Sequence, residues 1–151
     1  MATVRILVAD DYAALRTVLA RGLSAEPEIE VVGEAADGYS AVLLAGRLKP
    51  DIVLMDINMP GLDGIEATRR IVRQCPQIQV IGLSVHSFEF YARRLFEAGA
   101  RGYVLKDGDM DELLEAIATV RSGRTYVSAE VMGLGRGWSR LKRPRQLSRS
   151  G

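Results

Sequence analysis

The sequence predicts an α/β fold in which helices cover both faces of a parallel sheet. Short apolar runs rich in β-branched residues alternate five times with longer stretches whose apolar residues repeat every three or four positions. The short runs are apolar almost throughout, which is typical of strands buried on both faces. Proline, glycine and clustered polar residues separate the successive stretches, so each one is expected to be a separate element.

The first two strand–helix units follow this pattern closely. Residues 4–9 are apolar apart from one arginine and predict a strand, and residues 14–23 carry apolar side chains at helical spacing. Residues 29–33 predict a short second strand. Residues 38–49 predict a helix, which ends before a proline because the residue preceding proline disfavours helical geometry.

The third and fourth units have the same organisation. Residues 51–56 are apolar between two aspartates and predict a strand, residues 58–61 are rich in turn formers, and residues 62–74 predict a helix closed by a Cys-Pro pair. Residues 78–83 then predict the fourth strand and residues 87–98 the fourth helix.

The last unit consists of a short strand at residues 102–105 and a helix at residues 109–121, which Gly123 ends. Acidic residues begin this helix and an arginine lies in its last turn, as the helix dipole favours. Five such units predict a doubly wound, five-stranded parallel sheet with the flavodoxin-like strand order 2-1-3-4-5 and helices on both faces.

Composition narrows the class of protein. The chain has 151 residues, 26% of them charged, and a single cysteine, Cys75, so an internal disulfide and a thiolate zinc cluster are excluded. It shows neither a signal peptide nor an apolar run long enough for a membrane helix, so we expect a cytoplasmic protein without membrane contact. Residues 134–151 hold six of the 20 basic and none of the 19 acidic residues, so the first 133 residues carry a net charge of −5.

Polar side chains stand at the carboxyl ends of four predicted strands. Asp10 and Asp11 follow the first strand, Asp56 ends the third, Ser84 follows the fourth and Lys106 follows the fifth. Sites in doubly wound sheets form at this edge, so we expect the five side chains in one site.

The acidic residues favour a magnesium site. Clustered carboxylates repel one another, and Mg²⁺ relieves that repulsion while accepting one or two carboxylates, waters and a phosphate as ligands. We expect Asp11 and Asp56 to be the carboxylate ligands, the backbone carbonyl of Asn58 to lie close by, and Asp10 to hold a metal-bound water. Asp56 is the best candidate nucleophile because it ends a central strand.

The remaining polar groups suit a phosphoryl group. Lys106 offers a compact positive charge and Ser84 a hydrogen bond to its oxygens. Each residue also has an ordinary explanation on its own: an aspartate at a strand end is usually a helix N-cap, a lysine is usually solvated, and Ser84 can cap the next helix. Five suitable groups at four strand ends together favour function.

Four longer segments resemble the receiver domains of bacterial two-component response regulators. They are residues 4–11, 51–64, 81–84 and 99–106, within a resemblance that covers about residues 3–123. The amino-acid sequence of residues 98–106 and 123–128 resembles that of the subgroup with a C-terminal helix-turn-helix DNA-binding domain. The chain is therefore expected to hold a receiver domain at residues 1–123 and a basic linker or tail, disordered in part, at residues 124–151.

The resemblance implies a phosphorylation-dependent signalling switch rather than an enzyme, although such domains assist their own phosphorylation and dephosphorylation. Asp56 would accept a phosphoryl group from a histidine of a sensor kinase, with Mg²⁺ at Asp10 and Asp11. Ser84 and Tyr103 would be the switch residues, and the surface of the fourth helix, fifth strand and fifth helix would change. Val85, His86 and Asn58 are candidates for modulating access to the site, although a surface histidine with no catalytic role is the simpler interpretation of His86.

The resemblance has two departures and leaves further partners open. Asp107 stands where many receivers have proline, and Val85 where the family often has a smaller residue. Transcription control through DNA would need the C-terminal DNA-binding domain. Residues 146–149 resemble the first residues of that domain. A homodimer would use either the fourth helix, fifth strand and fifth helix or the first and fifth helices.

Three other functions fit the sequence less well. An aspartate-nucleophile phosphatase usually has a second acid two residues after the nucleophile, where this chain has Asn58, and it needs a substrate cap. A flavin mononucleotide carrier would need a phosphate loop where Asp10 and Asp11 stand. A receiver-like scaffold that works without phosphorylation would not need the acidic set or Lys106. The glycines of residues 133–137 lack the Lys-Ser/Thr of a nucleotide loop.

Overall fold

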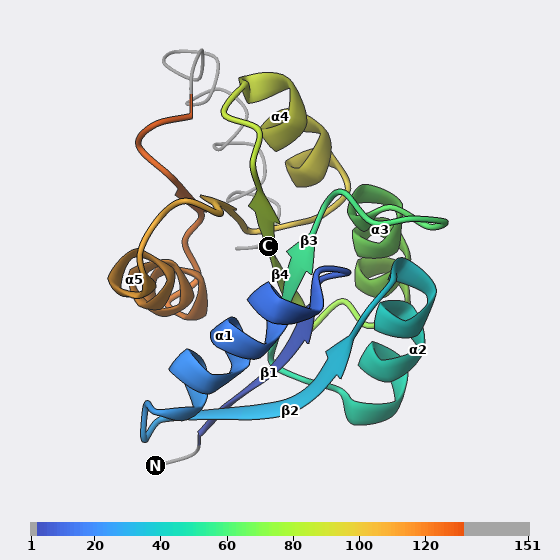
Figure 1. The fold of residues 1–151 in the computed structure, drawn as a ribbon. Helices are drawn as coiled ribbons and strands as arrows, with labels where there is room; N and C mark the ends of the chain where they lie inside the picture. Colours follow the sequence, from blue (N-terminus) through green and yellow to red (C-terminus); the bar gives the residue numbers. More distant parts are fainter. Residues whose placement is uncertain (1–2, 132–151) are drawn as a thin grey trace.

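The computed structural model describes residues 3–131 of the chain, in which helices lie on both faces of a central sheet (Figure 1). The strands are β1 (Val4–Ala9), β2 (Ile29–Ala35), β3 (Ile52–Asp56), β4 (Gln79–Ser84), β5 (Gly102–Leu105) and β6 (Tyr126–Val127). The helices are α1 (Ala13–Ser24), α2 (Gly38–Leu48), α3 (Gly64–Gln74), α4 (Glu89–Glu97) and α5 (Met110–Arg121).

All neighbouring strands pair in parallel, in the order β2-β1-β3-β4-β5-β6. The predicted fold class and the order 2-1-3-4-5 are thus confirmed, and β6 extends the sheet beyond β5. This strand lies within the segment that the sequence analysis assigned to the linker, so the domain division after residue 123 stays a prediction. The glycines and basic residues further along the tail lie outside the described residues.

Alternating residues of the central strands build two cores, one on each side of the sheet. Ile6 and Val8 of β1 pack in the core with residues of α1 and α5, whereas Leu7 and Ala9 pack in the core with residues of α2, α3 and α4. All four side chains are fully buried. The central strands therefore need apolar residues at nearly every position, which is why their sequences read as continuous apolar runs.

Aspartates fix the starts of three helices. The side chains of Asp37, Asp63 and Asp109 each accept a hydrogen bond from a backbone N–H in the first turn of α2, α3 and α5. This capping places the start of α3 at Gly64, two residues after the predicted start, and the start of α5 one residue later than predicted. The helix α4 is also shorter at both ends than the predicted range.

The connection from β3 to α3 is tightly closed. A Cβ atom placed on Gly64 would overlap the carbonyl oxygen of Asp56 and the Cα atom of Ile57. The N–H group of Gly64 also donates to the carbonyl oxygen of Ile57 at 3.1 Å. Only glycine lets the start of α3 approach the end of β3 this closely, so the connection keeps the first turn of α3 against the backbone of Asp56.

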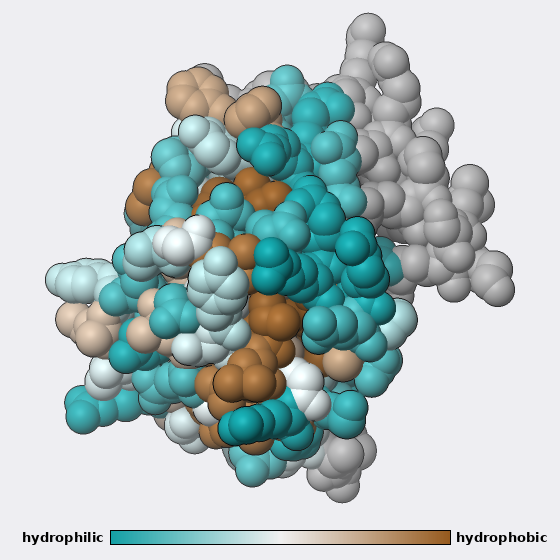
Figure 2. Space-filling model, turned by 90° about the vertical axis from the view of Figure 1, so that its right-hand side faces the viewer, coloured by the Kyte–Doolittle hydropathy of each residue, from teal (hydrophilic) through white to brown (hydrophobic). Residues whose placement is uncertain are grey.

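The surface over α2, α3 and α4 is mixed, with apolar residues showing between hydrophilic ones (Figure 2). Tyr39 and Leu43 of α2 are 61% and 55% exposed, and the guanidinium of Arg70 lies 6.0 Å from the centre of the Tyr39 ring. Within the described part of the chain, every helix is too short or too polar to cross a membrane.

Candidate functional site: an acidic cluster with a lysine at the carboxyl edge of the sheet

Three carboxylates gather where β1 and β3 end. One oxygen atom each of Asp10, Asp11 and Asp56 lies within 4.8 Å of the others. Asp10 and Asp56 are buried, whereas Asp11 is exposed at the mouth of the cluster. The topology produces this arrangement, because parallel strands β1 and β3 are neighbours and both end at the same edge.

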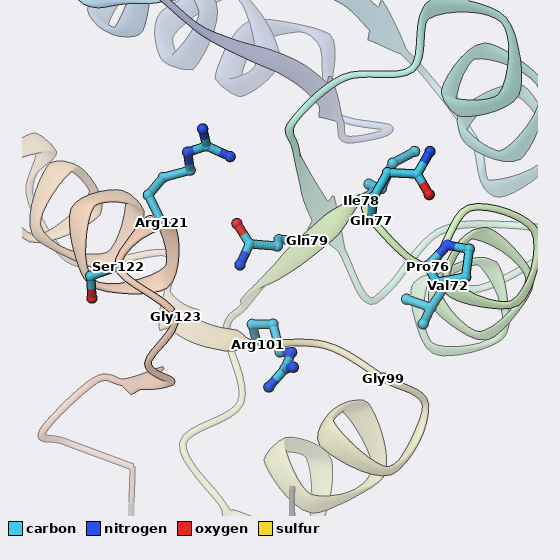
Figure 3. A pocket seen from close by; sticks show the side chains of 10 residues that line it. All are labelled: Val72, Pro76, Gln77, Ile78, Gln79, Gly99, Arg101, Arg121, Ser122 and Gly123. Carbon is cyan, nitrogen blue, oxygen red and sulfur yellow. The ribbon is translucent and has the colours of Figure 1, made fainter. Parts of the chain in front are cut away.

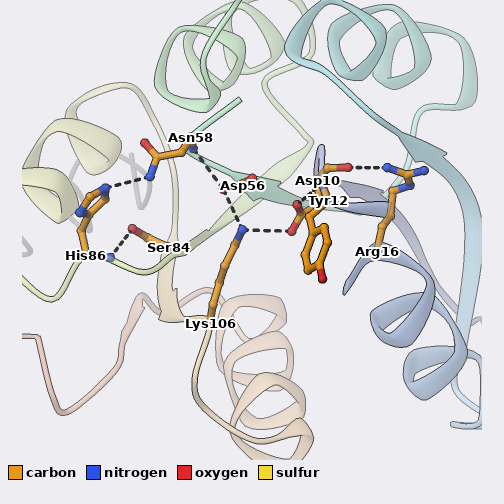
Figure 4. Close-up of polar contacts among 8 residues, drawn as sticks. All are labelled: Asp10, Tyr12, Arg16, Asp56, Asn58, Ser84, His86 and Lys106. Carbon is orange, nitrogen blue, oxygen red and sulfur yellow. Dashed lines mark hydrogen bonds and ion pairs between the residues drawn. The ribbon is translucent and has the colours of Figure 1, made fainter. Parts of the chain in front are cut away.

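Lys106 connects the two buried carboxylates (Figure 4). Its Nζ atom lies 3.2 Å from Oδ2 of Asp10 and 3.1 Å from Oδ1 of Asp56. The strand β5 brings the lysine there, since the N–H group of Lys106 donates to the carbonyl oxygen of Ser84 at 2.8 Å. A partly buried cation shared by two carboxylates lowers the repulsion between them.

Asp56 sits in a setting that disfavours its charged form. Burial raises the pKa of Asp56 to about 6 from 3.8, although the Asn58 N–H bond and Lys106 act in the opposite direction. The charge of Asp10 adds to the rise. The Asn58 N–H group donates to Oδ1 of Asp56 at 3.1 Å and fixes the side-chain orientation. Near neutral pH this carboxyl group is ionised, but its charge lacks full compensation.

The sequence-predicted switch residues lie next to the acidic cluster and are linked through the backbone of His86. The Oγ atom of Ser84 accepts a hydrogen bond from the His86 N–H group at 2.9 Å. The hydroxyl of Tyr103 donates to the His86 carbonyl oxygen at 2.6 Å. Tyr103 is fully buried, and burial raises the pKa of its phenol. A displacement of Ser84 would therefore reach Tyr103 through the backbone of a single residue, His86.

The side chain of His86 lies between Asn58, in the loop after β3, and Tyr91 of α4. The Asn58 amide nitrogen lies 2.8 Å from Nε2 of His86, and because that amide group only donates, Nε2 accepts. On its other side the His86 ring stacks on Tyr91 of α4, with ring centres 4.0 Å apart and planes inclined by 16°. Val85, the remaining residue predicted to modulate access, is 68% exposed at the rim.

Two residues of this neighbourhood were missed by the sequence analysis. Arg16 of α1 donates from Nη1 to the carbonyl oxygen of Asp10 at 2.6 Å and pairs with Glu34 at 3.1 Å. Tyr91 provides the stacking surface for His86. Only their position in the sequence could have indicated them. Each lies near the start of a helix that begins at the carboxyl edge of the sheet, where the site is.

A second hollow lies at the opposite edge of the sheet, between the turn before β4 and the end of α5. It has a volume of about 520 Å³ and contains two arginines, Arg101 and Arg121. Their side chains point in different directions (Figure 3), and Nη1 of Arg121 lies 3.9 Å from Asp51. The two charges therefore do not converge on a common point as the polar groups around Asp56 do.

Comparisons with known proteins agree on one family. A sequence profile described as "Response regulator receiver domain" matches residues 6–118. The chain is similar to the transcriptional regulatory protein DegU of Brevibacillus brevis (41% identity, 85% of this chain, 54% of the relative) and to the response regulator GacA of Pseudomonas protegens (40% identity, 85% of this chain, 60% of the relative). The matched region thus spans little more than half the length of these relatives.

Solved structures show the same likeness. A two-component response regulator of the LuxR family from Aurantimonas has a TM-score of 0.83 and 34% identity, over 97% of this chain and 99% of the other. The signal receiver domain of the putative response regulator NarL from Mycobacterium tuberculosis has a TM-score of 0.77 and 34% identity, over 82% of this chain and all of the other.

Proposed function

The chain belongs to the response regulator receiver domain family, and on this premise we propose that Asp56 accepts a phosphoryl group from a phosphohistidine of a sensor kinase. A carboxylate oxygen of Asp56 attacks phosphorus, the bond from phosphorus to the histidine nitrogen breaks, and the leaving imidazole retains the electron pair. The observation that carries this proposal is the pair of contacts from Lys106 to Asp56 and Asp10. They hold a positive charge beside the carboxyl oxygen that would react.

The residues of the cluster fit a magnesium ion. Asp10, Asp11 and Asp56 offer three carboxylate oxygens within 4.8 Å, and Lys106 is the cation paired with the two buried ones. With the backbone carbonyl of Asn58 they form an oxygen-only set, which is the set that Mg²⁺ prefers. When bound, Mg²⁺ would supply positive charge against both the carboxylates and the phosphoryl oxygens.

Lys106 and Ser84 are proposed to contact the phosphoryl oxygens. Lys106 has 17% of its side chain exposed, so its charge is only partly screened by water. The Ser84 hydroxyl accepts from the His86 N–H group, and as a hydroxyl it can also donate its own hydrogen to a phosphoryl oxygen. Movement of Ser84 toward that oxygen would loosen the backbone of His86 and, through it, the hydrogen bond of the Tyr103 hydroxyl. The proposed output is a changed surface on α4, β5 and α5.

Access of water to the phosphorylated site is proposed to depend on Asn58, Val85 and His86. The bond between Asn58 and His86 joins the loop after β3 to the loop after β4 across the mouth of the site. Stacking on Tyr91 holds the histidine ring in that position. The exposed Val85 adds an apolar side chain at the same rim. Together these contacts would set the lifetime of the acyl phosphate.

The larger protein is proposed to control transcription. The named relatives include a transcriptional regulatory protein, and the matched region spans only 54% of it, so DNA contact would belong to a C-terminal domain outside this chain. A homodimer through α1 and α5 is also proposed. A hollow of about 190 Å³ lies between these helices, and Val18 beside it is 62% exposed. Apolar exposure of this kind favours a protein partner.

The phosphorylation reaction can be tested with acetyl phosphate as donor. We expect the chain with Mg²⁺ to gain one base-labile phosphoryl group, which the Asp56→Asn variant does not gain. The matched control is Asp107→Asn, which removes an exposed carboxylate beside Lys106 and should be phosphorylated like the wild type. Absence of an adduct on the wild-type chain would favour a scaffold, and continuous release of phosphate from many esters would favour a hydrolase.

A further inference from the structure

The chain segment after α5 is bonded to the strand that carries the switch tyrosine. The N–H group of Tyr126 donates to the carbonyl oxygen of Arg101 at 3.1 Å, and the N–H group of Ser128 donates to that of Tyr103 at 3.0 Å. Residues Tyr126–Val127 thereby form β6 beside β5. This segment is drawn in orange, after α5, in Figure 1. The segment thus lies in the sheet, as the edge strand beyond β5.

Ser128 makes a further bond to β5 with its side chain. Its Oγ atom accepts from the N–H group of Leu105 at 3.0 Å, in a fully buried setting. Ser128 is 2% exposed, so no solvent replaces this acceptor if the hydroxyl is removed. Leu105 directly precedes Lys106 and lies two residues after Tyr103. Both sides of the end of β5 are therefore fixed, by Ser84 on one side and by Ser128 on the other.

We propose that Ser128 is a positioning residue for the phosphoryl site and couples the occupancy of Asp56 to the attachment of residues 124–131. It acts by holding the end of β5, and with it Lys106 and Tyr103. This inference rests on the proposed function, because it presumes that Asp56 and Lys106 bind a phosphoryl group. It adds a route by which the state of that site reaches the chain segment beyond α5.

Thermodynamic linkage makes this coupling reciprocal. If detaching Ser128 changes the affinity of the site for a ligand, then the ligand must change the detachment of Ser128 by the same factor. Beryllofluoride with Mg²⁺ serves as the ligand, since it is a phosphoryl mimic that has been bound to receiver domains of solved structure. Coupling between sites is commonly about 5-fold to 150-fold, so an effect of at least about fivefold is expected.

Thr125 provides a matched control on the same segment. It is 6% exposed, but its hydroxyl oxygen has no hydrogen-bond partner within the described residues. Thr125→Val therefore changes a buried side chain of the segment without removing a bond to β5. Ser128→Ala removes the acceptor of the Leu105 N–H group, and Ser128→Thr retains a hydroxyl.

The experiment measures beryllofluoride affinity in the presence of Mg²⁺ for the wild type and the three variants. We expect Ser128→Ala to weaken binding at least about fivefold, Ser128→Thr to restore most of it, and Thr125→Val to bind like the wild type. Equal affinity of Ser128→Ala and wild type, or an equal loss in Thr125→Val, would overturn the inference. A wild-type chain that binds no beryllofluoride would instead overturn the proposed function.

Amide hydrogen exchange on the wild-type chain tests the same coupling without any substitution. When beryllofluoride and Mg²⁺ are added, the N–H groups of Tyr126 and Ser128 should exchange more slowly. The rise in protection should equal the factor by which Ser128→Ala weakens beryllofluoride binding. Unchanged protection at both amides, with beryllofluoride bound, would contradict the coupling even if Ser128→Ala failed to fold.

Discussion

Asp56→Asn should stabilise the fold, although it removes the residue on which the proposed function depends. The pKa of Asp56 is raised from 3.8 to about 6, so the folded chain binds this proton more tightly than the unfolded chain. Stability therefore falls as the pH rises from about 4 to about 6 and stays low above it. The shift of about two pKa units lowers the free energy of unfolding of the wild type by about 3 kcal/mol above pH 6. Asparagine carries no charge, so the variant does not suffer this loss.

Urea unfolding of both proteins without divalent cations measures this effect. We expect Asp56→Asn to be more stable than the wild type, with an advantage that grows by ~2 kcal/mol between pH 4.5 and 7.5. The control Asp107→Asn, at an exposed carboxylate, should stay within ~0.5 kcal/mol of the wild type at both pH values. An advantage of Asp56→Asn that is independent of pH, or a loss of stability at pH 7.5, would refute the reasoning about the buried charge.

Three other substitutions test the structure around the site. Gly64→Ala should cost about 3 kcal/mol in urea unfolding because its Cβ atom would overlap the Asp56 carbonyl, whereas Gly46→Ala in α2 meets open space and should be neutral or stabilising; equal effects would contradict the close packing. Tyr103→Phe should lose about 1–2 kcal/mol, since the partly buried carbonyl of His86 is left without its donor, and unchanged stability would argue against that bond. His86→Ala should speed loss of phosphate from the phosphorylated chain roughly two- to tenfold, as expected for release of an aromatic pair; a longer-lived adduct would show that His86 does not shield the site.

The sheet could be predicted from the sequence because burial on both faces leaves a strong pattern. The strands at residues 4–9 and 102–105 have the predicted bounds, and residues 6–9 and 102–105 of them are buried. The gathering of Asp10, Asp56 and Lys106 followed from topology, as residues at the carboxyl ends of parallel strands share one edge. No distance was needed for that step.

Other features depend on contacts that leave no pattern in the sequence. The strand β6 has two residues, too few to show any period, and its place depends on backbone bonds to β5. Asp10 and Asp11 are adjacent and chemically identical, yet only Asp10 points inward to Lys106. The ring of His86 is positioned by Asn58 and Tyr91, which stand far apart along the chain. Packing in three dimensions decides each of these outcomes.

The central claim is that Asp56, its neighbouring carboxylates and Lys106 form one site for a phosphoryl group and a divalent cation. A crystal structure of the chain with beryllofluoride and Mg²⁺ tests it most directly. We predict beryllofluoride bound to a carboxylate oxygen of Asp56, within contact of Lys106, and the cation beside Asp10 and Asp11. Beryllofluoride absent from Asp56 at saturating concentration, or a cation bound away from the acidic cluster, would contradict the claim.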